Sequence, residues 1–435
     1  MTALVAYINR LRGFSPNARL LLARSLIAPL GFGIWGVVFN IYLLTIEVDG
    51  EPLFGIDFIF TLIAVDWLVH GLAAFPAGLF SDRFGRRTSF LFASILAVAA
   101  SLTKLFTLDP TLLLILAGLT GLGSSFHAVT SGPFLIENCR PEDRTHLFSA
   151  QTTFGLTAAT FGALLGGVLP SALALLGGTD LVTTAHARFA LVLAIPILLI
   201  GLLPIYLIRE QWVESKAYAR YPWYTAWAHN LTSLKTILKL CSVSAIAALG
   251  IGAIVPVFNI YFFDKFQIGE EQVGYIFAIS SLAAAAGMVV APFLVEHLGR
   301  VRTIVLTKLL SVPFLLLVAL APTVFLAAVP FMFRAIFNDM GGPIFSLFSM
   351  EQVRPEERGT TAGMTHSASE FPMGITGLVM GGVMARSVEW MIPFVVAAVF
   401  TTLAYLVFLR HFRGAEVGVT ADASAAGVAR KAASP

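Results

Sequence analysis

The chain has 435 residues, of which 57% are hydrophobic and only 12% are charged. An ordinary soluble domain carries roughly 25% charged residues, so this composition excludes a water-soluble globular protein. The net charge of +3 is small and gives no support to nucleic-acid binding.

Apolar runs recur along the whole chain, and each is close to the roughly 20 residues that a helix needs to cross a bilayer. Dividing the chain at charge clusters and turn residues predicts an all-α integral membrane protein with twelve spans. The first apolar run is full length, without a small-residue cleavage site, so it is expected to be a retained helix. The predicted spans are 24–46, 57–80, 89–108, 111–138, 147–177, 188–208, 236–262, 273–295, 303–320, 323–350, 360–385 and 389–409.

Basic residues predict the orientation of these spans, because Lys and Arg concentrate in cytoplasmic loops. Both terminal segments and every second loop together hold most of the 28 Lys and Arg. The alternate loops hold only Arg188, Lys265 and Arg386. A multi-pass protein of the cell (inner) membrane with both termini in the cytoplasm is therefore expected. Cys139 and Cys241 fall near cytoplasmic span ends, where no disulfide is expected.

The sequence repeats itself at long range. The pentapeptide VFNIY occurs at 38–42 and again at 257–261, which is a spacing of 219 residues. Two further pairs have a spacing of 214: DRFGRRTS (82–89) with EHLGRVRT (296–303), and ENCRPEDR (137–144) with EQVRPEER (351–358). The difference of five residues is expected in the first and seventh outer loops, where loops tolerate it.

The repeat predicts two six-helix halves, an arrangement in which one half can rock against the other around a central site. The N-terminal half is expected to cover 1–208 and the C-terminal half 236–410. A cytoplasmic linker over 209–235 joins them, and a disordered cytoplasmic tail over 411–435 follows.

The segment GLFSDRFGRRTS (78–89) resembles the loop between the second and third helices of the major facilitator superfamily. The resemblance covers essentially the whole chain, and it implies twelve helices in two pseudo-symmetric halves. Glycines in such a loop turn the chain tightly, while the acidic residue can accept hydrogen bonds from arginines or from a neighbouring helix N-terminus. The residues on the pattern are Gly78, Asp82, Arg83, Gly85, Arg86 and Arg87.

Two Glu–Arg pairs, Glu137 with Arg144 and Glu351 with Arg358, have the same spacing in both halves. This spacing is similar to the cytoplasmic charge network of sugar-porter-like members. Together with Asp82, Arg83, Arg86, Arg87, Glu296 and Arg300, they are predicted to form a cytoplasmic gate. The alternative is that they are ordinary solvated loop charges. Ala117, GALLGG (162–167) and LIREQW (207–212) depart from the drug-exporter and sugar-porter patterns, so no subfamily is assigned.

Ionisable residues inside spans are costly and mark candidate functional positions. Asp66 and His70 lie one turn apart on the second span, and His366 and Glu370 do so on the eleventh. The resemblance implies that these two helices approach each other between the halves, so the two pairs could meet. We expect them to handle protons, with Asp66 and Glu370 as the carriers; a fixed polar clamp is the alternative.

The predicted substrate site lies on helices one, four, seven and ten, which line the central cavity in the resembling family. Arg334, Asn338 and Asp339 come from span ten. Ser124 and His127 come from the equivalent stripe of span four, and Asn40 and Asn259 come from the repeated pentapeptide. The alternatives are an Arg and an Asp that satisfy each other within the bundle and a His127 that is simply packed and hydrogen-bonded.

These observations predict a secondary active transporter of a small organic solute. Proton-coupled efflux of an amphipathic or drug-like compound, as an antiporter of the plasma membrane, is expected first, from the resemblance. Proton-coupled uptake of a sugar or another polar metabolite is the alternative, and a non-transporting membrane sensor is a second. The sequence lacks a phosphate-binding Gly-rich Lys-Ser/Thr loop and any evident metal or nucleophile constellation, so neither an ATP-driven pump nor an enzyme is expected. The expected partners are the solute, protons and the lipid bilayer, with no cofactor, no nucleic acid and a monomeric chain.

Overall fold

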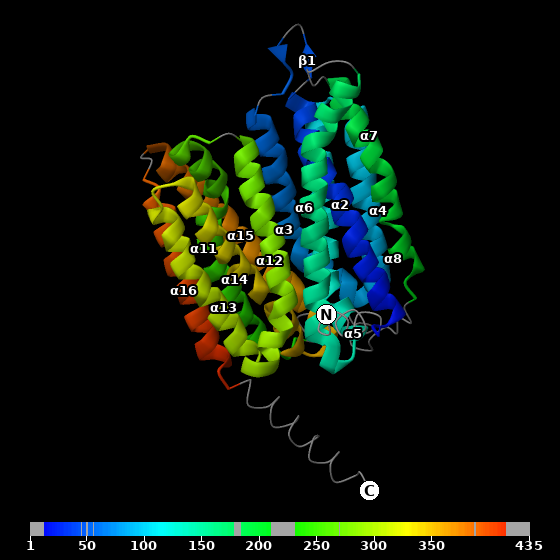
Figure 1. The fold of residues 1–435 in the computed structure, drawn as a ribbon. Coiled ribbons are helices and arrows are strands. Elements are labelled where there is room, and N and C mark those ends of the chain that lie inside the picture. Colours follow the sequence, from blue (N-terminus) through cyan, green and yellow to red (C-terminus); the bar gives the residue numbers. More distant parts are fainter. Residues whose placement is uncertain are drawn as a thin grey trace.

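The computed structural model describes residues 13–414 except 45, 49–50, 55, 178–183, 210–230, 269 and 387–388. Most of the predicted linker over 209–235 and of the predicted tail over 411–435 therefore lies outside the described residues. The described part is a bundle of long helices that run up and down between two ends (Figure 1).

Twelve long helices make up the described part of the bundle, six from each half of the sequence (Figure 1). Eleven of them are long and apolar enough to cross a membrane. The first six are α2 (Pro16–Leu44), α3 (Ile56–Phe84), α4 (Arg86–Thr103), α5 (Pro110–Glu137), α6 (Arg144–Leu176) and α7 (Thr184–Ile200), continued by the short α8 (Leu203–Leu207). The second six are α11 (Leu234–Ile260), α12 (Glu270–Leu298), α13 (Arg300–Leu320), α14 (Val324–Glu351), α15 (Arg358–Arg386) and α16 (Met391–Phe412). The predicted all-α membrane fold is confirmed.

Short elements join these helices. The first loop holds a hairpin of two-residue strands, β1 (Glu47–Val48) and β2 (Glu51–Pro52), whereas the corresponding loop of the second half holds a π-helical turn, η3 (Tyr261–Lys265). The predicted five-residue length difference between the halves falls at this place. The remaining short elements are the 3₁₀ turns η1 (Lys104–Phe106), η2 (Pro141–Asp143) and η4 (Pro355–Glu357).

The halves repeat each other in local geometry as well as in sequence. Gly85 and Gly299, 214 residues apart, both have a positive φ, which lets the chain turn sharply before α4 and α13. Asp109 and Thr323, also 214 apart, are the N-caps of α5 and α14, and each side chain accepts a hydrogen bond from the backbone N–H three residues later. Equivalent helices therefore begin at equivalent residues.

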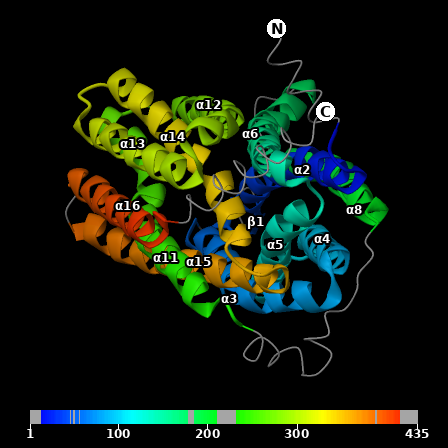
Figure 2. The same cartoon turned by 90° about the horizontal axis from the view of Figure 1, so that it is seen from below.

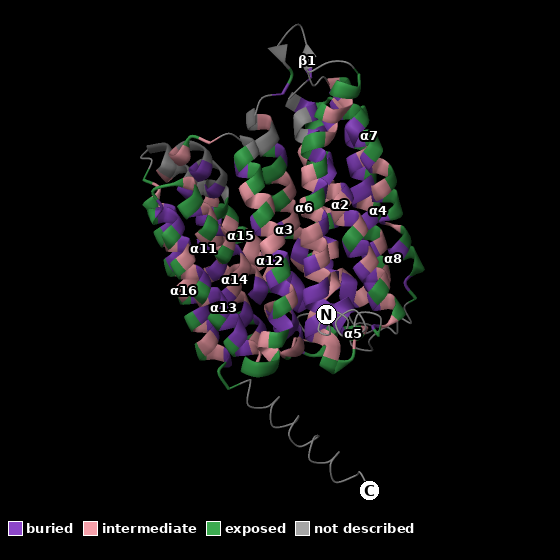
Figure 3. Cartoon of the chain, viewed as in Figure 1, coloured by how far each residue is buried: buried purple, intermediate pink, exposed green. Residues whose placement is uncertain are grey.

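The two halves meet along two seams, α3 against α15 and α6 against α12 (Figure 2). Buried residues gather between the helices, while exposed ones follow the outward faces (Figure 3). Small residues bring α3 and α15 into backbone contact: a Cβ at Gly78 would overlap the carbonyl oxygen of Gly359, and one at Gly363 would lie 2.5 Å from that of Ala74. We call the end of the bundle at which Gly359 lies the basic end, because the Arg-rich loops near 85, 140, 300 and 354 are there.

Candidate functional site

A cavity of about 410 Å³ lies between the halves. Helices α5 and α6 of the first half and α12, α13 and α14 of the second contribute its lining. The lining is rich in polar side chains, which a lipid-facing crevice would not have. Its polar residues are His127, Ser131, Gln151, Thr152, Lys308, Asn338, Asp339 and Ser346.

His127 on α5 forms the wall of the first half together with a cation that the sequence analysis did not single out. Nη1 of Arg24 on α2 lies 2.8 Å from Nε2 of His127, and Nη2 donates to Oγ of Ser94 on α4 over 3.3 Å. Only 6% of Arg24 is exposed. His127 is thus packed and hydrogen-bonded, as the alternative prediction expected, and it also lines the cavity. Its contact with a substrate stays a prediction.

The wall of the second half is a chain of three side chains. Nζ of Lys308 on α13 donates to Oδ1 of Asn338 over 3.3 Å, and Nδ2 of Asn338 donates to Oδ1 of Asp339 over 2.8 Å. Lys308 also lies over the ring of Tyr405, 5.5 Å from its centroid. Asn338 and Asp339 were predicted here, whereas Lys308 was not.

The two walls use the same two positions of the repeat, but the large and the small residue have changed places between them. At the spacing of 214, His127 corresponds to Gly341 and Ser94 corresponds to Lys308. A Cβ at Gly341 would lie 3.2 Å from Cε of Lys308, so the glycine makes room for the lysine. At this pair of equivalent positions, the large polar side chain comes from α5 in the first half and from α13 in the second.

Two of the other predicted substrate residues, Arg334 and Ser124, lie outside the cavity lining. Arg334 does not line this cavity, and its Cζ lies over the ring of Phe258, 4.8 Å from the centroid. Ser124 is exposed and also outside the cavity lining. Asn40 and Asn259 fall within α2 and α11, but their side chains lie outside the described part of the chain.

The repeated pentapeptide has a structural counterpart in paired cations and aromatic rings. Phe39 and Phe258 are its phenylalanines; Lys104 lies 5.7 Å from the ring centroid of Phe39, as Arg334 lies over Phe258. Nζ of Lys104 also donates to Oγ1 of Thr120, the residue that corresponds to Arg334. Both halves thus place a cation against the same phenylalanine of the repeat.

The acid and histidine pairs of α3 and α15 meet only in part. The rings of His70 and His366 stack, with centroids 6.0 Å apart and planes 21° apart. A Cβ at Gly71 would lie 2.9 Å from Cβ of Glu370, so Glu370 packs on the same seam. Asp66 instead faces α5, where Oγ1 of Thr120 donates to it over 2.8 Å. The two histidines thus meet across the seam, while Asp66 is held by a partner within its own half.

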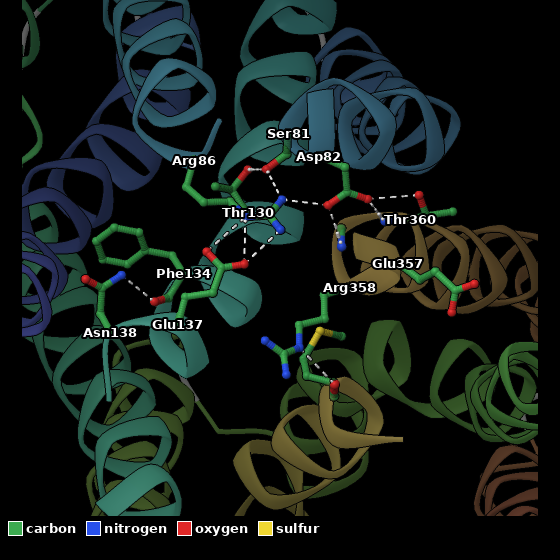
Figure 4. Close-up of polar contacts among 12 residues, drawn as sticks. Ser81, Asp82, Arg86, Thr130, Phe134, Glu137, Asn138, Glu357, Arg358 and Thr360 are labelled. Atoms are coloured by element: carbon green, nitrogen blue, oxygen red, sulfur yellow. Dashed lines mark hydrogen bonds and ion pairs between the residues drawn. The ribbon is translucent and has the colours of Figure 1, made fainter. Parts of the chain in front are cut away.

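At the basic end, Asp82 of α3 caps the first turn of α15 (Figure 4). Its carboxylate accepts from the backbone N–H groups of Gly359 at 3.0 Å and Thr360 at 2.8 Å, and from Oγ1 of Thr360 at 2.9 Å. Arg86 donates to Asp82 at 2.7 Å and to Glu137 at 3.0 Å. A carboxylate at a helix N-terminus is stabilised by the helix dipole. Because α3 belongs to the first half and α15 to the second, this contact joins the two halves.

The second half provides the matching contacts in a different form. Glu351 pairs with Arg300 of its own half and, at 3.3 Å, with Arg144 of the other half. Glu296, the counterpart of Asp82, lies 3.2 Å from Nε2 of His146 near the start of α6. Asp82, Arg86 and Glu137 thus form one group of predicted gate residues. Arg144, Arg300 and Glu351 form a second, and Glu296 pairs with His146.

Three further arginines of the predicted gate lie beside these groups. Arg87 donates to the carbonyl oxygen of Tyr206, and Arg358 donates to that of Met350. Arg83 lies half-buried in the last turn of α3. The hydrogen bonds of Arg87 and Arg358 thus hold helix ends within their own halves.

One acidic residue at the basic end was not predicted. Glu357 is buried, and its Oε1 accepts from the backbone N–H groups of Thr232 and Ser233 and from Oγ1 of Thr232, just before α11. Burial raises the pKa of this carboxyl, but the hydrogen bonds from Ser233 and Thr232 outweigh it and leave the pKa below its ordinary value. Glu357 thus fastens the start of α11 to the turn before α15.

Two repeated six-helix halves around a shared polar cavity, closed at one end by contacts between them, define a membrane transport protein. The family model described as Major Facilitator Superfamily matches residues 21–232 and 240–433. The chain belongs to this superfamily, as the resemblance of its sequence implied.

Solved structures with this fold include transporters of different kinds. The human organic anion transporter MFSD10 is 16% identical, with a TM-score of 0.70 over 90% of this chain and 99% of that one. The transporter FucP in the outward conformation is 12% identical, with a TM-score of 0.72 over 90% and 97%. A bacterial homologue of the iron transporter ferroportin is 15% identical, with a TM-score of 0.66 over 90% and 98%. A comparison with curated proteins gave no match.

Proposed function

We propose that this chain is a secondary active transporter that moves a small organic solute by alternating access and uses protons to drive it. The observation that carries the proposal is the polar cavity, which both halves line. Asp82, Glu351 and Glu296 each reach a residue of the other half at the basic end. When these contacts part, rocking of the halves opens the cavity toward that end. With the basic end in the cytoplasm, these contacts close the described conformation toward the cytoplasm.

Proton coupling is assigned to the seam between α3 and α15. His70, His366 and Glu370 lie together there, at a depth where ionisable groups are costly and call for a function. The seam has to part as the halves rock, so these groups exchange protein surroundings for water during the cycle. A proton can then be bound in one state and released in the other. Asp66, held by Thr120, is the second proposed carrier.

The polar lining bears on the substrate class. Of the two classes that the sequence left open, it favours a polar organic solute over an amphipathic or drug-like compound. Efflux, implied by the resemblance, remains the proposed direction, with uptake as the alternative.

The test is flux through the purified chain in proteoliposomes. Labelled organic acids, sugars and lipophilic cations are offered under an imposed pH gradient, with and without a protonophore. We expect one class to accumulate against its gradient and the protonophore to abolish this accumulation. Binding without flux for every class would contradict the proposal and favour the membrane sensor.

A variant pair separates coupling from transport. Glu370→Gln is expected to lose proton-driven accumulation while it still exchanges labelled for unlabelled solute. Glu389→Gln, at an exposed position just before α16, serves as the matched control and should behave as the wild type. Proton-driven accumulation by Glu370→Gln at the wild-type rate would remove Glu370 from the proposal.

A further inference from the structure

Arg24 is a buried cation with no carboxylate beside it among the described residues. It lies eight residues into α2, about 12 Å along the helix axis, and its partners are the neutral groups of His127 and Ser94. A guanidinium stays protonated in proteins. Among the residues that the structure describes, none of the carboxylates lies within ion-pair distance of it. A cation inside a membrane span is costly, and such residues usually have a function.

His127 connects this cation to the cavity. Because Arg24 donates to Nε2, that nitrogen is the acceptor and the ring hydrogen is on Nδ1. Nδ1 is buried and has no hydrogen-bond partner among the described residues. A residue that lines the cavity therefore holds an unused donor next to a permanent positive charge.

Lys308 brings a second cation from the opposite half. It is 8% exposed and lines the cavity, and its contacts are the neutral amide of Asn338 and the ring of Tyr405. The only carboxylate in the cavity lining is that of Asp339, which is occupied by the amide of Asn338 and forms no ion pair with Lys308 in the described structure. The cavity lining thus has one carboxylate, while Lys308 lies in the lining and Arg24 lies behind His127.

We infer that the transported solute is a small organic acid, held as its anion between His127, with Arg24 behind it, and Lys308. The inference rests on the proposed transport function and names the substrate class of that same cavity. An anion supplies the charge that the lining lacks and takes up the donors on both walls. Because the two walls belong to different halves, the bound anion joins them. A neutral sugar leaves both cations uncompensated, and a lipophilic cation is repelled.

The test uses matched pairs that differ in the acidic group. The melting temperature of the purified full chain is measured with gluconate against glucose, succinate against succinamide and benzoate against benzamide, with tetraphenylphosphonium as the cationic probe. At least one acid is expected to raise the melting temperature at a concentration where its neutral partner does not. If none of the acids outperforms its neutral partner, the inference is overturned, and this comparison needs no variant.

Substitution of Lys308 then tests whether the acid binds beside this residue. Lys308→Gln should raise the concentration of acid needed for half of the shift by about tenfold or more, as expected for loss of a buried charge partner. Lys308→Arg should keep most of the response. Lys239→Gln, at an exposed position on α11, is the matched control and should not change it. An unchanged response in Lys308→Gln would contradict the assigned site.

The two proposals fail in different ways. Flux of a sugar or of tetraphenylphosphonium in the proteoliposomes, with no response to any acid, would overturn the organic-acid inference and leave transport standing. Specific stabilisation by an acid that depends on Lys308, without flux of any solute, would support the inference and overturn the proposed transport.

Discussion

The guanidinium of Arg24 and the imidazole of His127 share one hydrogen bond of 2.8 Å, although both groups can carry a positive charge. The geometry requires Nε2 of His127 to be unprotonated, since a guanidinium can only donate. One permanent charge therefore supports a neutral ring at the cavity wall. The pair has the opposite arrangement to the common acid and histidine pair, in which a carboxylate favours the charged ring.

Arg24→Gln tests whether this charge serves function rather than stability. The amide can still donate to His127, whereas the cost of a buried cation is removed. We expect the variant without solute to melt no lower than the wild type, while the KM for the transported acid rises about tenfold or more. The measurements are thermal melting and initial rates of flux. A variant that melts lower and keeps its KM would show a purely structural role.

Gly341→Val tests whether the small residue at position 341 is needed to place Lys308 at the cavity. A Cβ at this position lies 3.1 Å from Oγ1 of Thr307 and 3.2 Å from Cε of Lys308, so a larger side chain displaces the lysine. We expect a loss of about 1 to 3 kcal/mol in stability and a raised KM. Gly374→Ala is the control, because a Cβ there meets nothing within 4 Å. A KM equal to that of the wild type would mean that the position of Lys308 does not matter.

Gly78→Ala tests the closed seam at the basic end. The new methyl group overlaps the carbonyl oxygen of Gly359 and forces α3 away from α15. We expect a cost of about 1 to 3 kcal/mol to the closed conformation and faster maleimide labelling of a cysteine at Ser367, whose hydroxyl donates to Gly71 across the seam. Gly274→Ala, with no neighbour within 4 Å of its Cβ, should leave the labelling rate unchanged. Equal rates in both variants would contradict a tight seam.

Glu357 predicts a pH dependence of stability. The folded protein holds the pKa of its carboxyl below the ordinary value of 4.5, so the unfolded state binds the proton more tightly. The stabilisation is present above the unfolded pKa and is lost as the pH falls through the folded pKa. We expect the melting temperature of the wild type to fall more steeply below pH 4.5 than that of Glu357→Gln. Parallel curves for the two proteins would show that the carboxylate is not what fastens α11.

Much of the fold and of the basic end could be predicted because both depend on short-range patterns. Hydrophobic runs predicted where the helices lie, and the repeat predicted that equivalent helices of the two halves have equivalent ends. Asp82, Arg86 and Glu137 lie within a few residues of helix ends, so the packing of the helices brings them together without fine rotational detail. Their counterparts Glu351 and Arg300 then follow from the repeat.

The cavity was harder to predict because it depends on depth and on helix rotation. The first span was predicted to begin at residue 24, whereas α2 begins at Pro16, so Arg24 was taken for a residue at a span end. Lys308 lies well inside α13, and its position within an apolar run was the signal that could have found it. Asp66 shares a face of α3 with His70, but periodicity does not say which neighbouring helix this face meets.

The proposed alternating access is tested most directly by locking the basic end. His146 and Glu296 belong to different halves and lie 3.2 Å apart. Both are replaced by cysteine in a chain with Cys139 and Cys241 changed to Ser, and a short cleavable bifunctional thiol reagent joins them. The control joins cysteines at Asn17 and Asn138, whose side chains touch at 2.9 Å within one half.

We predict that the link between the halves reduces solute flux to background, that a reductant restores it, and that the link within one half leaves flux intact. Undiminished flux through a chain whose halves are fully cross-linked at the basic end would contradict alternating access.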